Sequence, residues 1–333
     1  MKPKEGRSYK KITNQQILKK SEQEANLQKE INFKDIFTNE GSDLIFWCVK
    51  VGLIKEPTYC KLCRRRTNKI NSFRLSKKEK AFDRFVWRCK NKDCGNIEYI
   101  RKNSQLLSSF PRVNLRILLI YIFHHFCFLL PPSITNKTFN LSFSTIGKIS
   151  ELLTKWIVND EILDETFRGK LDGKNKIVEI DESCFFKRKY NRGRLLGQIW
   201  GFGAVERESG KLLVEVVEKR NAPTLLPLIQ KWISKESLYV ISDEWKPYKR
   251  LKKLEYNHIC INHSKQFVLP SNPQIHTQTI ENRWGQIKSL MRKSGRISRF
   301  LFPKKVKEIT WRINIKDNIQ AKLLEIILKY NYS

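Results

Sequence analysis

The stretch Ile177-Val178-Glu179-Ile180-Asp181 decides the fold, because three β-branched apolar residues within five positions predict a buried strand. An acid inside such a strand costs free energy unless a metal ion or another partner compensates its charge. Asp181 is therefore the first candidate for a functional residue. From about residue 175 onward the pattern changes to strands that alternate with helices.

The elements that follow this strand have the order strand, strand, helix, strand, helix, strand, helix. Glu208-Ser209-Gly210-Lys211 is typical of a hairpin turn, and Pro223 lies where proline favours a helix start. The order predicts an α/β fold, namely a ribonuclease H-like domain over residues 175–315 with a mixed five-stranded sheet and helices. The predicted elements are the strands Leu196–Val205, Leu212–Val217, Leu238–Ile241 and His258–Ile261, and the helices Thr224–Ile233, Trp245–Leu254 and Thr277–Lys293.

Three acids lie where such a sheet brings its functional groups together: Asp181 on the first strand, Asp243 directly after the fourth strand, and Glu281 near the start of the last helix. Phosphodiester chemistry develops charge on the attacking and leaving oxygens, and two hard cations such as Mg²⁺ or Mn²⁺ held by carboxylates stabilise both. Each acid also has a simpler interpretation. Asp243 could be a turn residue, Glu281 could complement the helix macrodipole, and Glu179 and Glu182 are competing ligands nearby.

A cysteine module over residues 57–105 precedes this domain. Cys60 and Cys63 are separated by two residues, Cys89 and Cys94 by four, and the chain between the pairs is long enough for two β-hairpins. Such paired spacing predicts a zinc ribbon with one structural Zn²⁺. The alternative is four buried, reduced cysteines, which leaves the paired spacing without a cause.

The remaining segments are mostly helical. Residues 1–30 are predicted to be a flexible basic arm, residues 31–56 a short helical segment, and residues 316–333 a C-terminal tail. Residues 111–165 have a helical pattern. Within them, a turn at Asn140–Ser142 followed by Ser and Thr capping residues resembles a helix-turn-helix, although a plain helical hairpin fits equally well.

The charge balance points to a polyanionic partner. There are 65 Lys+Arg against 33 Asp+Glu, a formal net charge of +32, and nucleic acid is the usual partner for such an excess. A highly charged surface without this role is the alternative. There is no secretory signal, and Ile117–Leu130 is too short to span a bilayer, so no membrane partner is expected. The residues expected to contact nucleic acid are Arg64, Arg65, Lys189, Arg192, Arg194, Lys246, Lys288 and Arg292.

Several motifs together resemble a known family. They are Val178–Ser183, Lys189–Arg194, Trp200–Arg207, Ile241–Tyr248, Asn262–Ser264, His276–Trp284 and Trp311–Asn314. Over residues 31–315 the chain resembles the transposases of the Merlin superfamily of eukaryotic DNA transposons and the related bacterial insertion-sequence transposases.

The resemblance implies a DDE-type triad of Asp181, Asp243 and Glu281 with two Mg²⁺ or Mn²⁺ ions. It also implies cut-and-paste transposition, in which element ends are hydrolysed and the freed 3′-hydroxyls attack target DNA. A homo-oligomer that pairs the two element ends, and a nuclear location, are further expectations. Two other functions stay open: a transposon-derived DNA-binding protein that does not transpose, and a ribonuclease H-like nuclease.

Overall fold

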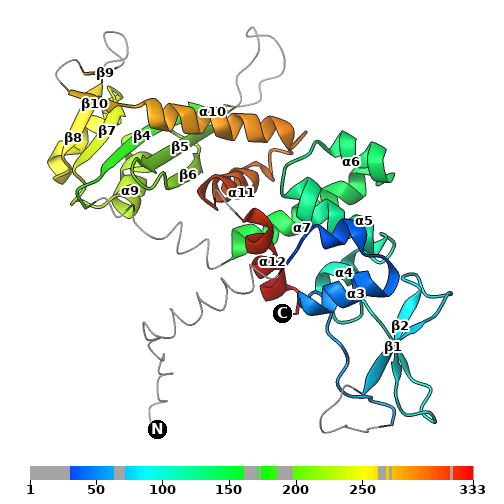
Figure 1. Cartoon of the computed structure of the whole chain (residues 1–333). Coiled ribbons are helices and arrows are strands. Elements are labelled where there is room, and N and C mark those ends of the chain that lie inside the picture. The colour runs from blue at the N-terminus through cyan, green and yellow to red at the C-terminus, as the bar shows by residue number, and fades with distance from the viewer. Residues whose placement is uncertain are drawn as a thin grey trace, which may run out of the picture. The chain divides into compact units, whose positions relative to one another are not determined.

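A computed structural model of the chain describes residues 31–63, 72–160, 171, 174–185, 198–261, 268–269, 272–315 and 318–332 (Figure 1). The chain divides into two compact units, one with residues 1–120 and 331–333 and the other with residues 121–330. The predicted N-terminal arm lies outside the described residues. The same holds for five of the predicted nucleic-acid contacts: Arg64, Arg65, Lys189, Arg192 and Arg194.

The first unit combines short helices with a three-stranded antiparallel sheet in the order β1-β2-β3. Asn331, near the C-terminus, belongs to this unit: its side-chain amide donates to the Leu53 carbonyl, and its side-chain oxygen accepts from the Ser104 hydroxyl and the Leu106 N–H. The elements are α2 (Asp35–Thr38), α3 (Gly41–Lys50), β1 (Phe73–Lys77), β2 (Phe85–Cys89), β3 (Ile97–Tyr99), α4 (Gln105–Ser109) and α5 (Leu115–Ile120).

The second unit begins with helices. Within the helical pattern predicted over residues 111–165, the chain changes to a π-helix, η1 (Tyr121–Phe126), directly after α5. Next come α6 (Pro132–Phe139) and α7 (Phe143–Asn159), and near the end of the chain α12 (Ile319–Tyr330) packs on α7, where the rings of Trp156 and Tyr330 stack.

The sheet of the second unit has five strands in the order β6-β5-β4-β7-β8. Strand β4 is antiparallel to β5 and parallel to β7, β5 is antiparallel to β6, and β7 is parallel to β8. This mixed order confirms the predicted ribonuclease H-like fold. The strands are β4 (Ile177–Cys184), β5 (Trp200–Glu206), β6 (Leu212–Val217), β7 (Tyr239–Asp243) and β8 (His258–Ile261).

Two of the connections differ from the prediction. The segment predicted as a helix from Trp245 to Leu254 forms two short 3-10 helices, η3 (Lys246–Arg250) and η4 (Lys252–Leu254). Between the predicted strand His258–Ile261 and the predicted helix Thr277–Lys293, where no element was predicted, lies a two-stranded antiparallel pair, β9 (Val268–Leu269) and β10 (Asn272–His276). The other helices are α9 (Ala222–Trp232), α10 (Gln278–Lys293) and α11 (Phe302–Ile315).

Helices cover both faces of the sheet. Val178 and Ile180 of β4 join a buried cluster with Leu225 and Ile229 of α9. The opposite face is covered by α10 and α11, whose buried residues pack against β5 and β6 (Figure 1). Because side chains alternate along a strand, Glu179 and Asp181 face α10, whereas Glu182 faces α9. The start of α10 therefore lies over the carboxylates of β4.

Candidate active site

Asp181 is held by a tryptophan of α10. The indole N–H of Trp284 donates a hydrogen bond to Asp181 Oδ2, with 3.1 Å between the two atoms. Gly203 lies opposite Asp181 on β5, and a Cβ atom at Gly203 would approach the Trp284 ring to 2.7 Å. Glycine at this position therefore leaves the space that the indole needs to reach Asp181.

Asp243 ends β7, the strand next to β4. The parallel register pairs Glu179 with Ile241, so two residues further on Asp181 and Asp243 are level on adjacent strands. Such strands are about 4.8 Å apart, and level residues point to the same face. Asp243 Oδ1 accepts a hydrogen bond of 3.1 Å from the Trp245 N–H, which fixes the carboxylate at the end of the strand.

Glu281 projects from the first turn of α10, as its position in the sequence predicts. Its Oε1 accepts a hydrogen bond of 3.1 Å from the hydroxyl of Thr277, the residue before the helix. Unlike Asp181, the side chain is exposed, so an ion bound here would remain accessible to a large substrate.

The electrostatics connect the three acids. The pKa of Asp181 is raised from 3.8 to about 8, chiefly by burial and, in smaller measure, by the charges of Glu182, Asp243 and Glu281. Like charges that disfavour ionisation in this way mark a concentration of negative potential. A divalent cation would relieve it, because its own charge would favour the ionised carboxyl.

The three carboxylates do not meet as tightly as the ligands of a single ion. Among the described residues, the group of metal-type ligands whose atoms all lie within 4.8 Å of one another is the cysteine quartet. A two-ion site permits wider spacing. With ions about 3.5–4 Å apart and oxygen–metal distances of about 2 Å, the outer carboxylates can be up to about 8 Å apart. A site in which all three acids bind one ion is therefore not preformed in this structure.

Glu182, one of the two competing ligands, has partners on the other face of the sheet. The Tyr248 hydroxyl donates a hydrogen bond to its carboxylate, and the Arg220 guanidinium lies 3.7 Å from it. Burial raises the pKa of Glu182 to about 7, although the Tyr248 hydrogen bond opposes this. Glu182 thus adds negative potential near Asp181. Its own oxygens contact Tyr248 and Arg220 and not the three candidate ligands.

Glu179, the other competing ligand, anchors the start of α10. Its side chain is fully buried. Oε1 accepts a bond of 2.6 Å from Arg207 Nε, and Oε2 accepts one of 2.8 Å from the N–H of Ile280. Arg207 also donates to the carbonyl of His276, at 2.9 Å. Glu179 therefore positions α10, and with it Glu281, on β4. The sequence alone did not predict this role; its only signal was the shared strand face of Glu179 and Asp181.

The cysteine module brings its four sulfurs together, as the paired spacing predicts. Cys60 and Cys94 have their sulfurs 3.5 Å apart, and Cys63 and Cys89 have theirs 3.8 Å apart. These spacings fit tetrahedral zinc, because Zn–S bonds of about 2.3 Å place the sulfurs about 3.8 Å apart. The cluster is therefore of the zinc-ribbon type.

The surroundings of Cys60 favour the thiolate form of its side chain. Desolvation opposes ionisation of Cys60, but the N–H groups of Cys63 and Leu62 and the side-chain amide of Asn96 outweigh it and lower the pKa to about 6. Asn96 Nδ2 donates to the Cys60 sulfur at 3.2 Å. Zinc binds the thiolate form.

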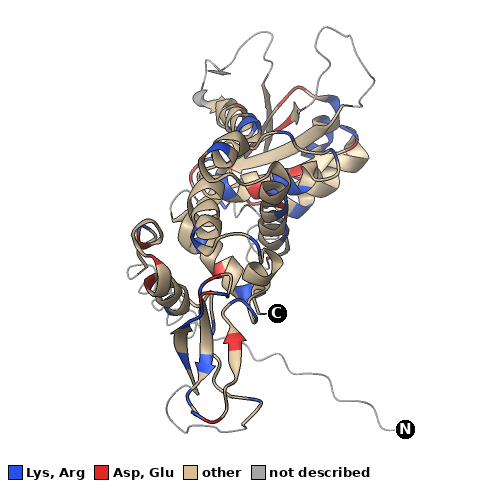
Figure 2. Ribbon diagram, turned by 90° about the vertical axis from the view of Figure 1, so that its right-hand side faces the viewer, with Lys and Arg blue, Asp and Glu red and all other residues tan. Residues whose placement is uncertain are grey.

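Three of the predicted nucleic-acid contacts are described. Lys246 is exposed in η3, Lys288 is half-buried on α10 two turns after Glu281, and Arg292 is exposed in the last turn of α10. Lysines and arginines lie on both helices and strands (Figure 2). The predicted turn before α7 has the expected caps: Asn140 adopts a left-handed conformation, and the Ser142 hydroxyl accepts from the Thr145 N–H at 3.1 Å. Whether this helix pair binds DNA stays a prediction.

Comparisons with known proteins agree with a transposase-type domain. Residues 170–314 match the family model of the ISXO2-like transposase domain, of the DDE type. This segment contains Asp181, Asp243 and Glu281 and is therefore similar to a DDE transposase domain. The finer assignment to the Merlin superfamily is not confirmed by the match. No curated protein matches the chain.

Three solved structures are similar over part of the chain. The catalytic core domain of BIV integrase has 18% identity over 42% of this chain and 81% of its own, with a TM-score of 0.28. The HTLV-2 integrase catalytic core domain in complex with magnesium has 15% identity over 43% and 86%, with a TM-score of 0.27. A simian T-cell lymphotropic virus intasome in complex with a PP2A regulatory subunit has 14% identity over 54% and 67%, with a TM-score of 0.29. Because these scores are low, the fold rests on the strand order.

Within the described residues, every helix is too short or too polar to cross a lipid bilayer.

Proposed function

We propose that this chain is a DNA transposase that cuts element ends and joins the freed 3′-hydroxyls to target DNA, with Asp181, Asp243 and Glu281 as its catalytic carboxylates. The observation that carries the proposal is the match of residues 170–314 to a DDE transposase domain, since all three acids lie within it and on one side of a ribonuclease H-like sheet.

Two Mg²⁺ or Mn²⁺ ions would supply the chemistry, by stabilising charge on the attacking and leaving oxygens. The chain itself supplies geometry. Trp284 fixes the orientation of Asp181 through its indole N–H, and Thr277 does the same for Glu281 through its hydroxyl. Glu179 holds the start of α10 against β4 through the Ile280 N–H. These contacts set the distance between the strand carboxylates and the helix carboxylate before any ion binds.

The other modules would bind the DNA. A structural Zn²⁺ on Cys60, Cys63, Cys89 and Cys94 would hold the ribbon, and the excess of basic side chains would neutralise phosphates. Pairing two element ends requires a homo-oligomer. A nuclear location is part of the proposal, and its support is the resemblance of the sequence motifs to the Merlin superfamily.

An excision assay tests the proposal. A plasmid carries a marker between the two genomic DNA segments that flank the gene, and the purified full chain is added with Mg²⁺ or Mn²⁺. We expect release of the marker by the wild type. We expect no release by Asp181→Asn, Asp243→Asn or Glu281→Gln, and normal release by the control Glu236→Gln, whose side chain is exposed.

The assay separates the alternative functions. DNA binding without release, by the wild type, would favour a transposon-derived binding protein. Cleavage of RNA–DNA hybrids without release would favour a ribonuclease H-like nuclease. If the triad variants bind the flanking DNA as tightly as the wild type, their defect lies in chemistry; an equal loss of binding would contradict a catalytic role for the three acids.

A further inference from the structure

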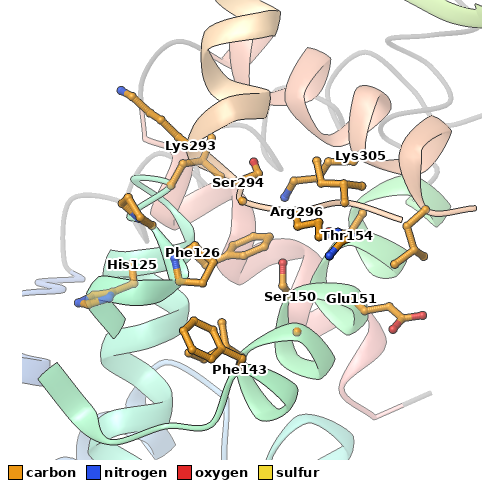
Figure 3. Close-up of a pocket in the computed structure, with 18 of the residues that line it drawn as sticks. His125, Phe126, Phe143, Ser150, Glu151, Thr154, Lys293, Ser294, Arg296 and Lys305 are labelled. Carbon is orange, nitrogen blue, oxygen red and sulfur yellow. The ribbon is translucent and has the colours of Figure 1, made fainter. Parts of the chain in front are cut away.

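The second unit contains a cavity away from the carboxylates. It has a volume of about 590 Å³ and lies between η1 and the start of α6, the helix α7, and the segment from residue 292 to residue 305 (Figure 3). Pockets that hold small organic ligands have volumes of about 300–1,000 Å³. The space is therefore large enough for a nucleotide and too small for a DNA duplex.

Apolar side chains form much of its lining. Tyr121, Phe126, Leu129 and Ile146 are buried and line the cavity. Phe143, the first residue of α7, also lines it but keeps 59% of its surface exposed. An exposed aromatic ring beside a cavity is a surface on which a planar base can stack.

Cations outnumber acids in the lining by six to one. The single acid is Glu151 on α7, and in the close-up Arg296 and Lys305 lie close to Thr154 around the space (Figure 3). Such an excess favours an anionic ligand. The cations are Lys155, Arg292, Lys293, Arg296, Lys304 and Lys305.

One of these cations is built into the wall. Lys305 is 8% exposed, and its Nζ donates a hydrogen bond of 2.7 Å to Glu308. Arg312, also 8% exposed, donates from Nε to the same carboxylate at 2.8 Å. Two cations thus share one anion. Burial lowers the pKa of Lys305, although Glu308 opposes this, and an anion in the cavity would favour the charged lysine.

We propose that this cavity binds one unpaired nucleotide of a DNA strand, with the base against Phe143 and the phosphate near Arg296 and Lys305. The inference rests on the proposed function and adds a second contact on the same substrate. An apolar lining fits a base better than it fits an inorganic anion. The rim cations Arg292 and Lys293 belong to the last turn of α10, so a strand that follows this helix from Glu281 would reach the cavity.

The length of α10 also sets the distance between the cleaved phosphate and the unpaired nucleotide. Glu281 and Arg292 are eleven residues apart, or about 16 Å along α10 at 1.5 Å per residue. At about 3.4 Å per nucleotide along one strand, the unpaired nucleotide lies about five positions from the phosphate that is cleaved. Removing one base from the stack costs free energy, which stacking on Phe143 and the phosphate contacts would offset.

Fluorescence anisotropy of labelled DNA, measured with the full chain and without divalent ions, tests the proposal. The probes are (dT)20 and a perfect 20-base-pair duplex. We expect Phe143→Ala to weaken binding of (dT)20 about fivefold to a hundredfold, the range for loss of one stacked base, and to change duplex binding less than twofold. The matched control is Phe128→Ala: Phe128 is 54% exposed and does not line the cavity.

A charge variant provides a second readout. We expect Arg296→Gln to weaken (dT)20 binding and to lower its salt dependence by about one phosphate contact. Arg299→Gln, an exposed neighbour outside the lining, should change neither.

Three outcomes would overturn the proposal: unchanged (dT)20 affinity in Phe143→Ala, an equal loss for (dT)20 and the duplex, or micromolar binding of free dTMP that (dT)20 does not displace. The last result would indicate a site for a free nucleotide. Because no ion and no cleavage are involved, these results leave the proposed transposase activity untouched. Conversely, a chain that binds as expected but never excises DNA would refute only the proposed function.

Discussion

Replacing Asp181 by asparagine is expected to stabilise the protein in the absence of Mg²⁺. Asparagine keeps an oxygen that can accept the hydrogen bond from the Trp284 indole but has no charge to bury. The wild-type carboxyl must ionise in a buried site beside Glu182 and Asp243, which raises its pKa from 3.8 to about 8. A residue that destabilises the resting protein is expected at a site that awaits cations.

The size of the effect follows from this pKa. The folded-state pKa is the higher one, so the folded protein holds an extra proton. The stability that this proton contributes is fully present below about pH 4 and is lost as the pH rises through about 8. The stability difference between Asp181→Asn and the wild type should therefore grow by about 1.4 kcal/mol per pH unit over this window. Its upper limit is about 6 kcal/mol at pH 9, and relaxation around the carboxyl reduces it to a few kcal/mol.

Urea unfolding followed by tryptophan fluorescence measures this difference between pH 5 and pH 9. The buffer lacks Mg²⁺ and EDTA and contains one equivalent of zinc, so that the cysteine cluster is the same in all samples. The matched control Asp181→Ala also removes the charge but leaves the Trp284 N–H without its acceptor, at a cost of about 1–3 kcal/mol. Its gain in the free energy of unfolding should therefore be smaller than that of Asp181→Asn. An Asp181→Asn protein that is no more stable than the wild type at any of these pH values would refute the reasoning.

Three further predictions concern the carboxylate site and the cysteine cluster. Gly203→Ala should destabilise the protein by about 1–3 kcal/mol in thermal unfolding, since its Cβ would lie 2.7 Å from the Trp284 ring. The control Gly285→Ala lies on the same helix as that ring, but its Cβ would have nothing within 4 Å. This control should stabilise the protein by about 0.5–1 kcal/mol. Glu179→Ala should cost about 3–5 kcal/mol, because the partly buried Arg207 and a helix N–H lose their fully buried acceptor. It should also speed amide exchange at the start of α10; protection equal to that of the wild type would contradict the anchoring role. Cys89→Ser should abolish stoichiometric zinc, measured by mass spectrometry, and should make the ribbon sensitive to protease, whereas a retained equivalent of zinc would show that the ion is held elsewhere.

The sequence predicts the catalytic domain well because its signals are local. The apolar run at Ile177–Ile180 and the hairpin turn at Glu208–Lys211 are each contained in a few residues, and the alternation of strands and helices then leaves few possible topologies. The cysteine spacing is local in the same way, because a tight turn suffices to bring Cys60 near Cys63, whereas the approach of the two pairs to each other depends on the fold of the ribbon.

The contacts that hold the site are not local and escaped prediction. Glu179 meets the N–H of Ile280 across 101 residues of sequence, and nothing in the pattern of either segment indicates this pairing. The segment from Trp245 to Leu254 has helical spacing, but a 3-10 turn has a similar period, so the apolar pattern alone does not separate the two kinds of helix. The cavity beside α7 depends on helices that are distant in sequence, so it could be found only in three dimensions.

Anomalous diffraction from crystals of the full chain soaked in MnCl₂ tests the central claim most directly. We predict manganese within about 2.5 Å of carboxylate oxygens of both Asp181 and Asp243, and with bound DNA a second ion on the Glu281 side, about 3.5–4 Å from the first. Manganese bound only at other acids, with these three side chains keeping their present hydrogen bonds to Trp284, Trp245 and Thr277, would contradict the claim.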